Sequence, residues 1–115
     1  MSEGIGILGF LHIAIGILVI ALSIPLLMGR VPMNRWYGTR LPESYTSEAN
    51  WYAVNRYGAI RMTWYGIAVI LVGVAVLRVP PLLGSLWFFA ALAAPAVLMV
   101  PMLVTLLRYA KRLPK

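Results

Sequence analysis

The sequence predicts an all-α integral membrane protein with three transmembrane helices and a cytoplasmic, partly helical loop between helices 1 and 2. Two observations support this fold class. Hydrophobic residues make up 62% of the chain and its mean hydropathy is +0.87, well above the roughly 45–50% apolar content of soluble domains. The apolar residues also gather in long blocks of about 20 residues, the length a helix needs to cross about 30 Å of hydrocarbon. Because the chain has 115 residues, we expect it to form a single membrane domain, residues 1–115.

The first apolar block predicts a helix at about residues 5–28, interrupted only by His12, Ser23 and Pro25. A cleaved signal peptide is the competing interpretation, because the segment 21–23 resembles a cleavage site. The residues before the block lack a basic region, however, and the block is longer than the apolar region of a typical signal peptide. We therefore expect this helix to remain in the protein.

Small residues recur every seven positions in the first helix, at Gly9, Gly16 and Ser23, and again at Gly66 and Gly73. Such a stripe lets two helices approach closely at a shallow left-handed crossing. The alternative is the general enrichment of glycine in membrane helices. We predict that these stripes are helix-packing positions.

The second block, residues 62–77, would span only about 24 Å as a helix, less than the hydrocarbon thickness. We therefore expect the helix to begin earlier and to cover about residues 47–77. Thr46 or Ser47 can cap this start, and Glu48 suits the positive end of the helix dipole. The first three turns of this helix would then lie outside the membrane, after a polar loop at 29–46.

The third block predicts a helix at about residues 83–107, followed by a basic tail at 108–115. The adjacent prolines at 80 and 81 end the second helix, because proline lacks a backbone donor and restricts the residue before it. Pro95 and Pro101 should bend the third helix.

Basic residues are unevenly distributed between the two sides of this arrangement. The net charge is +7, and nine of the ten Lys/Arg residues lie with the loop, the start of the second helix and the tail, whereas Arg78 lies on the other side. The positive-inside rule places the N-terminus outside and the loop and C-terminus in the cytoplasm of a multi-pass cell-membrane protein. Anionic lipid headgroups, not nucleic acid, are the expected partners of this charge. A specific anionic ligand or an acidic protein segment is the alternative.

The composition argues against catalysis. The chain has one His, no Cys and three acidic residues, all of them Glu. Nucleophilic and metal sites need convergent groups that this set does not provide. We therefore predict no enzyme activity, no metal and no cofactor. His12 lies on the same helical face as Gly9 and Gly16, so it should face protein. A neutral histidine bonded to backbone or water is the preferred interpretation, and a proton relay is the alternative.

The polar loop and the helix start that follows it carry the candidate binding residues. Gly38 permits backbone conformations that other residues avoid, and Arg40 offers a planar fork for carbonyls, carboxylates or phosphates. Trp51 and Asn55 share one helical face. These residues form either a binding surface or a loop that satisfies its own polar groups. The full set is Asn34, Gly38, Arg40, Pro42, Trp51, Asn55, Arg56 and Gly58.

The spacing of these residues resembles the signature of the SdpI-type membrane proteins, named for a bacterial immunity protein against a secreted toxic peptide. The resemblance covers residues 34 to about 77 and comprises Asn34-x3-Gly38-x-Arg40-x-Pro42, Thr46-Ser47, Trp51 and Asn55-Arg56-x-Gly58. It implies a membrane-embedded body that resists the toxin and, in the family's best-known member, holds a repressor at the membrane when toxin is present. This chain departs from that member in having fewer apolar helices, and it has Asn55 where the family often has His.

Two functions therefore stand as expectations. The first is SdpI-like immunity to, or sensing of, a toxin or antimicrobial peptide, with the loop docking a cytoplasmic protein partner. The alternative is a small accessory or assembly subunit of a larger membrane complex. Because three helices leave small-residue stripes to bury, we also predict a homo-oligomer or a larger membrane partner.

Overall fold

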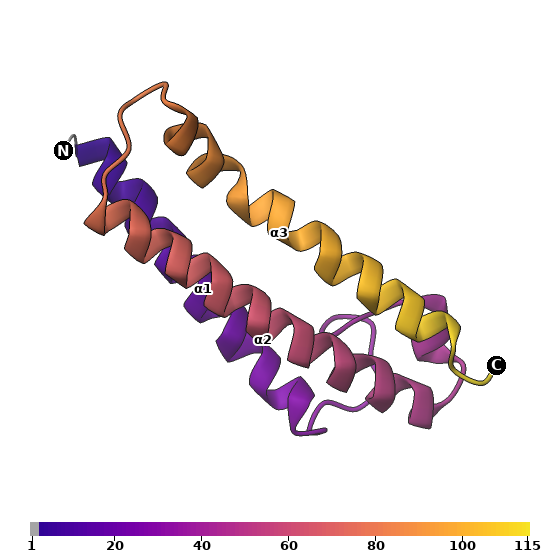
Figure 1. Ribbon diagram of the computed structural model, residues 1–115. Helices are drawn as coiled ribbons and strands as arrows, with labels where there is room; N and C mark the ends of the chain where they lie inside the picture. Colours follow the sequence, from indigo (N-terminus) through magenta and orange to yellow (C-terminus); the bar gives the residue numbers. More distant parts are fainter. Residues whose placement is uncertain (1–2) are drawn as a thin grey trace.

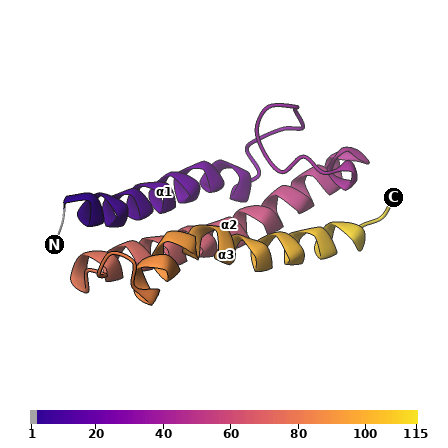
Figure 2. The ribbon, with the colours of Figure 1, turned by 90° about the horizontal axis from the view of Figure 1, so that it is seen from above.

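The computed structural model describes residues 3–115, and this part of the chain forms three long helices. They are α1 (Glu3–Leu27), α2 (Glu48–Arg78) and α3 (Leu86–Lys111), with a short 3-10 helix, η1 (Pro42–Tyr45), in the loop before α2. The helices lie roughly along one another in a body of 52 × 23 × 18 Å. The loop and the C-terminus lie at one end, called here the loop end, and the start of α1 lies with the α2–α3 connection at the other (Figures 1 and 2).

All three helices are long and apolar enough to cross a membrane. Large apolar side chains point outward from each of them, for example Phe10, Leu71 and Phe89, all more than half exposed. An uncovered apolar surface of this extent is unfavourable in water and suits contact with lipid chains. The described chain is therefore an all-helical bundle of the kind expected in a bilayer.

The backbones of α1 and α2 touch where their glycine stripes meet. A methyl group built on Gly73 would lie 2.7 Å from the carbonyl oxygen of Gly9, and one built on Gly66 would lie 2.8 Å from that of Gly16. Both distances are too short for a real side chain. The two helices are antiparallel, so each glycine of one stripe faces a glycine of the other. This contact makes α1 and α2 the tightly packed pair of the bundle.

The same register continues one heptad further, where it places Ser23 opposite Ala59. Both residues are fully buried. The Ser23 hydroxyl donates to the carbonyl oxygen of Val19 within its own helix, at 2.7 Å, so a polar side chain enters the contact without an unpaired hydrogen.

Two small apolar clusters join α3 to the pair. At the N-terminal end, Ile5 of α1, Val76 of α2 and Ala91 of α3 pack together. At the loop end, Val54 of α2 packs on Leu106 and Ala110 of α3, with partly buried residues of the loop and tail around them. Along its apolar membrane-spanning stretch, α3 is buried less than α1 or α2.

Local capping explains where the helices begin and end. Ser47 caps α2, because its hydroxyl oxygen accepts from the backbone N–H of Asn50 at 3.0 Å. Ser85 caps α3 in the same way through the N–H of Phe88, at 3.1 Å. α3 therefore begins at Leu86 instead of 83, since Gly84 has φ +81 and interrupts the apolar run. The helix continues to Lys111, beyond the expected end at 107, so the first part of the basic tail is helical.

Candidate functional site

The amide of Asn55 in α2 holds the loop against the helix. Its Oδ1 accepts from the backbone N–H of Thr39 at 2.5 Å, and its Nδ2 donates to the carbonyl oxygens of Trp51, at 2.9 Å, and Thr39, at 3.4 Å. The side chain is 2% exposed. One buried amide thus pairs with both backbone polar groups of Thr39, as a neighbouring strand would. We call Gly38, Thr39, Trp51 and Asn55 the loop clasp.

Gly38 fits the loop clasp because it has no side chain. Its φ is +120, and a methyl group there would lie 2.6 Å from Oδ1 of Asn55 and 3.2 Å from the indole ring of Trp51. Both the conformation and the space therefore require glycine. Gly58, one turn after Asn55 on the same face of α2, plays a related part, since a methyl group there would lie 2.9 Å from Oγ1 of Thr39.

The indole of Trp51 ties the start of the loop to α2. The side chain is fully buried, and its Nε1–H donates to the carbonyl oxygen of Val31 at 2.8 Å. Its ring packs on that of Tyr45, with centroids 5.6 Å apart. Ser44 closes the turn that begins at Pro42. Its hydroxyl donates to the carbonyl of Thr39 at 2.9 Å and accepts from a backbone N–H at 3.1 Å.

Asn34 organises the first turn of the loop. Its Oδ1 accepts from the backbone N–H groups of Trp36 at 2.8 Å and Tyr37 at 2.7 Å. The Asn34 carbonyl accepts from the hydroxyl of Tyr45 at 2.8 Å, and the hydroxyl of Tyr37 donates to the carbonyl of Leu22 in α1. The loop is therefore tied to α1 as well as to α2.

Two of the candidate binding residues, Arg40 and Arg56, point outward. Arg40 does not join the loop clasp, and its Nη1 donates to the carbonyl of Arg35 at 2.6 Å. Arg35, Arg40 and Tyr45 line an open hollow of about 500 Å³ on the loop. Arg56 borders a separate hollow of about 280 Å³ beside Tyr52 and the end of α1. The structure thus brings Gly38, Trp51, Asn55 and Gly58 together, and it leaves the two arginines on the surface.

His12 of α1 lies between two backbone carbonyls. Its Nε2 is 2.7 Å from the carbonyl oxygen of Ala91 in α3, its Nδ1 is 2.8 Å from that of Leu8, and the side chain is 4% exposed. In an uninterrupted helix the N–H of residue 95 would bind the Ala91 carbonyl, but residue 95 is proline and has none. His12 therefore takes the carbonyl that Pro95 leaves free. Which ring nitrogen carries the hydrogen depends on the tautomer of the imidazole.

This pairing predicts that the effects of changing His12 and Pro95 depend on each other. We expect His12→Leu to lower the free energy of unfolding by about 1–2 kcal/mol, because the Ala91 carbonyl loses its donor. In a Pro95→Ala background the N–H of residue 95 can bind that carbonyl, so His12→Leu should cost less. Denaturation of the four proteins in mixed detergent micelles measures this coupling, and strictly additive effects would contradict it.

Several residues of this region escaped the sequence analysis. Asn50 donates through Nδ2 to the carbonyl of Pro114, at 2.6 Å, and so ties the tail to the start of α2. Thr39 contributes through its backbone, which leaves no signal in the sequence, whereas Ser44 and Tyr45 were detectable only as polar residues in a turn. Within residues 3–115, no group of three His, Cys, Asp or Glu side chains is placed to hold a metal ion.

The comparisons with known proteins give one match. Neither a curated protein nor a solved structure matches the chain. The sequence model described as the SdpI/YfhL protein family matches residues 30–105, which include the loop, the loop clasp, all of α2 and most of α3. Together with three helices suited to spanning a bilayer, this match identifies the chain as a multi-pass membrane protein that belongs to the SdpI/YfhL protein family.

Proposed function

We propose that this protein confers resistance to, or senses, a membrane-active toxic peptide, and that its loop is a docking surface for a cytoplasmic protein. Family membership supports the general role, as an SdpI-like membrane protein. The observation that carries the docking role is the loop clasp, which holds the loop rigidly on α2 and leaves Arg35 and Arg40 facing outward. A fixed loop presents a surface at low entropic cost on binding.

The proposed topology places the N-terminus outside the cell and the loop and tail in the cytoplasm. Nine of the ten basic residues belong to the loop, the loop-end half of α2 and the C-terminal segment, whereas Arg78 lies at the far end of α2. An excess of Lys and Arg flanking membrane helices marks the cytoplasmic side. The loop would then be available to cytoplasmic proteins.

The chemistry of the loop surface fits an acidic protein segment. One N–H of Arg40 is held by the Arg35 carbonyl, which orients the guanidinium and leaves its other donors available. Tyr45 adds a hydroxyl and a ring to the same hollow, and the neighbouring Trp36 is 89% exposed. Paired guanidinium groups beside aromatic rings suit carboxylate recognition and contribute to specificity.

Complementation of a deletion strain tests this function. We expect deletion of the gene to increase sensitivity to at least one peptide in a panel of membrane-active toxins, and the intact gene to restore resistance. The Arg35→Gln/Arg40→Gln double variant should reach the membrane at normal levels and fail to restore it, whereas Arg112→Gln, an exposed charge of the tail, should succeed. Unchanged sensitivity across the panel would contradict the resistance role, and full protection by the double variant would contradict the docking role.

A second candidate, an accessory subunit of a larger membrane complex, rests on α3. Only 11% of its most apolar stretch is buried within the chain, and its outward face carries Leu92, Val97 and Val100, each more than half exposed. Lipid or another protein can cover this face. Purification from native membranes in mild detergent, with prior crosslinking, distinguishes them. A stoichiometric larger partner supports the subunit role, a second copy alone supports the homo-oligomer instead, and a monomer alone contradicts both.

A further inference from the structure

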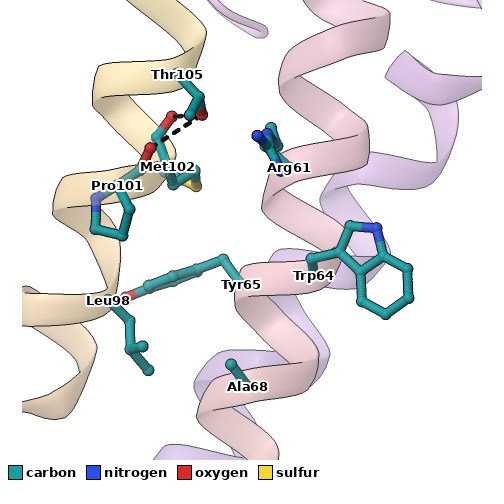
Figure 3. Close-up of a pocket in the computed structure, with 8 residues that line it drawn as sticks. All are labelled: Arg61, Trp64, Tyr65, Ala68, Leu98, Pro101, Met102 and Thr105. Atoms are coloured by element: carbon teal, nitrogen blue, oxygen red, sulfur yellow. Dashed lines mark hydrogen bonds between the residues drawn. The ribbon is translucent and has the colours of Figure 1, made fainter.

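α2 and α3 are joined by two tyrosine contacts and lie apart between them. The hydroxyl of Tyr65 donates to the carbonyl oxygen of Pro95 at 2.7 Å. Nearer the loop end, the rings of Tyr57 and Tyr109 stack with centroids 4.1 Å apart and planes 4° from parallel. Between these contacts the helices leave an open cavity of about 210 Å³, called here the α2–α3 opening. Its lining residues are Arg61, Trp64, Tyr65, Ala68, Leu98, Pro101, Met102 and Thr105 (Figure 3).

Among the described residues that line this opening, Arg61 is the charged one. Its Nε donates to the hydroxyl of Tyr57 at 3.3 Å, and its guanidinium carbon lies 5.6 Å from the centre of the same ring. No carboxylate in the described part of the chain pairs with it, and neither Nη nitrogen has an acceptor there. Tyr57 thus positions the guanidinium and leaves its planar pair of Nη groups available for an anion.

The other lining groups are suited to a hydrocarbon chain. Ala68, Leu98 and Met102 present apolar surface. The two hydroxyl groups are already engaged, because Tyr65 donates to Pro95 and the hydroxyl of Thr105 lies 2.9 Å from the carbonyl oxygen of Pro101. The indole of Trp64 adds one further N–H donor to the lining. The opening therefore has one cationic end and an apolar remainder, which matches an amphiphile better than a fully hydrated ion.

The position of Arg61 along α2 matches the depth of a lipid phosphate. From Arg61 to Arg78 the helix is about 25 Å long at about 1.5 Å per residue, a little less than the hydrocarbon thickness of about 30 Å. Arginine side chains at helix ends extend outward toward the headgroups, which covers the difference. The residues between the two arginines are apolar apart from Thr63 and two aromatic residues at the loop end. Arg61 and Arg78 therefore mark the two edges of the hydrocarbon, where phosphate groups begin.

From these observations we propose that the α2–α3 opening binds one anionic phospholipid of the leaflet at the loop end. Its phosphate pairs with the Nη groups of Arg61, and part of one acyl chain lies on Ala68, Leu98 and Met102. The cavity of about 210 Å³ is too small for a protein helix, and it is open to the surroundings of the bundle. This site is separate from the loop surface of the proposed function, so either can fail without the other.

Native mass spectrometry of the full chain tests this binding. Protein stripped of lipid in mild detergent is titrated with phosphatidylglycerol and with phosphatidylcholine of the same chains. We expect one phosphatidylglycerol per chain to bind in preference to phosphatidylcholine. Arg61→Gln should weaken that binding about tenfold, equivalent to ~1.4 kcal/mol. The matched control is Arg56→Gln, which removes the same charge from an exposed position of α2 outside the opening.

Each outcome of the titration bears on the proposal. Equal losses in the two variants would overturn it, because attraction to the overall positive charge would then explain binding. Displacement of the lipid by millimolar inorganic phosphate would overturn it too, as the site would then be one for a free anion. Equal binding of the two lipids would also overturn it, because the charge of the headgroup would then play no part in binding.

A second variant tests the apolar part of the site without touching Arg61. Ala68→Leu should reduce the space for the chain and weaken phosphatidylglycerol binding several-fold, while circular dichroism shows unchanged helix content. Ala90→Leu is the control, because Ala90 is an exposed alanine of α3 that does not line the opening. Unchanged lipid binding by a folded Ala68→Leu protein would contradict the proposed position of the chain. Should Arg61→Gln fail to fold, Ala68→Leu and its control decide the question.

Discussion

Gly16→Val is expected to prevent α1 from packing on α2. A methyl group at residue 16 would lie 2.5 Å from the carbonyl oxygen of Gly66, which belongs to a helix backbone and cannot rotate away. Overpacking of a core usually costs about 1–3 kcal/mol, and more where a backbone must shift. We expect a loss above about 3 kcal/mol and little folded protein in detergent. Thermal denaturation followed by size-exclusion chromatography measures the loss.

Gly4→Val is the matched control for this change. Gly4 lies in the same helix and is exposed, and a methyl group built on it meets no atom within 4 Å. The control should denature at nearly the temperature of the parent protein. Equal stability of the two variants would show that the helices do not pack through their glycines.

Asn55→Leu is expected to detach the loop from α2, the second-largest effect expected of a single substitution. Leucine has a similar size but offers no partner to the N–H and carbonyl of Thr39 or to the carbonyl of Trp51. Each buried polar group left unpaired costs about 1–3 kcal/mol, so the loop should detach from α2. Trypsin should then cut after Arg35 or Arg40 at least about tenfold faster than in the parent protein. Mass spectrometry of the fragments measures this rate.

Asn50→Leu is the matched control, because it makes the same substitution at a residue that holds the C-terminal tail instead of the loop. Asn50 binds the carbonyl of Pro114, so its loss should expose the tail to trypsin after Lys111 or Arg112 and leave the loop protected. The loop clasp is contradicted if Asn55→Leu leaves the loop resistant, or if both variants expose the loop equally.

The close packing of α1 and α2 could be predicted from the sequence, because the spacing of residues along a helix fixes which of them share a face. Residues seven apart lie on one face, so the stripes at 9 and 16 and at 66 and 73 pointed to close packing before any partner was known. The start of α2 was also accessible, because Ser47 and Glu48 are local signals. Ser85 was missed as the cap of α3, because Leu83 had been counted with the apolar run.

The contacts of the loop were not accessible, because they depend on backbone groups distant in sequence. Trp51 binds the carbonyl of Val31. Arg40 binds the carbonyl of Arg35, one of several kinds of acceptor that the sequence left open. His12 shows the same limit. Because residue 95 is proline, the sequence indicates that the carbonyl of Ala91 has no helical donor. Only the placement of α3 against α1 shows that His12 binds this carbonyl.

The loop clasp also changes the meaning of the family-like motif. Gly38, Trp51, Asn55 and Gly58 contact one another or the loop backbone, so they shape the loop. In the proposed docking role, recognition falls to the exposed Arg35 and Arg40. We therefore expect changes at Asn55 to act on docking indirectly, through the position of Arg40.

Cysteine labelling in intact cells is the most direct test of the proposed topology. The chain has no cysteine, so single cysteines placed at Leu83, in the α2–α3 connection, and at Arg35, in the loop, report without background. A membrane-impermeant maleimide should label the cysteine at 83 in intact cells and the cysteine at 35 only after lysis. Labelling of both in intact cells, or of the cysteine at 35 alone, would contradict three crossings with the loop in the cytoplasm.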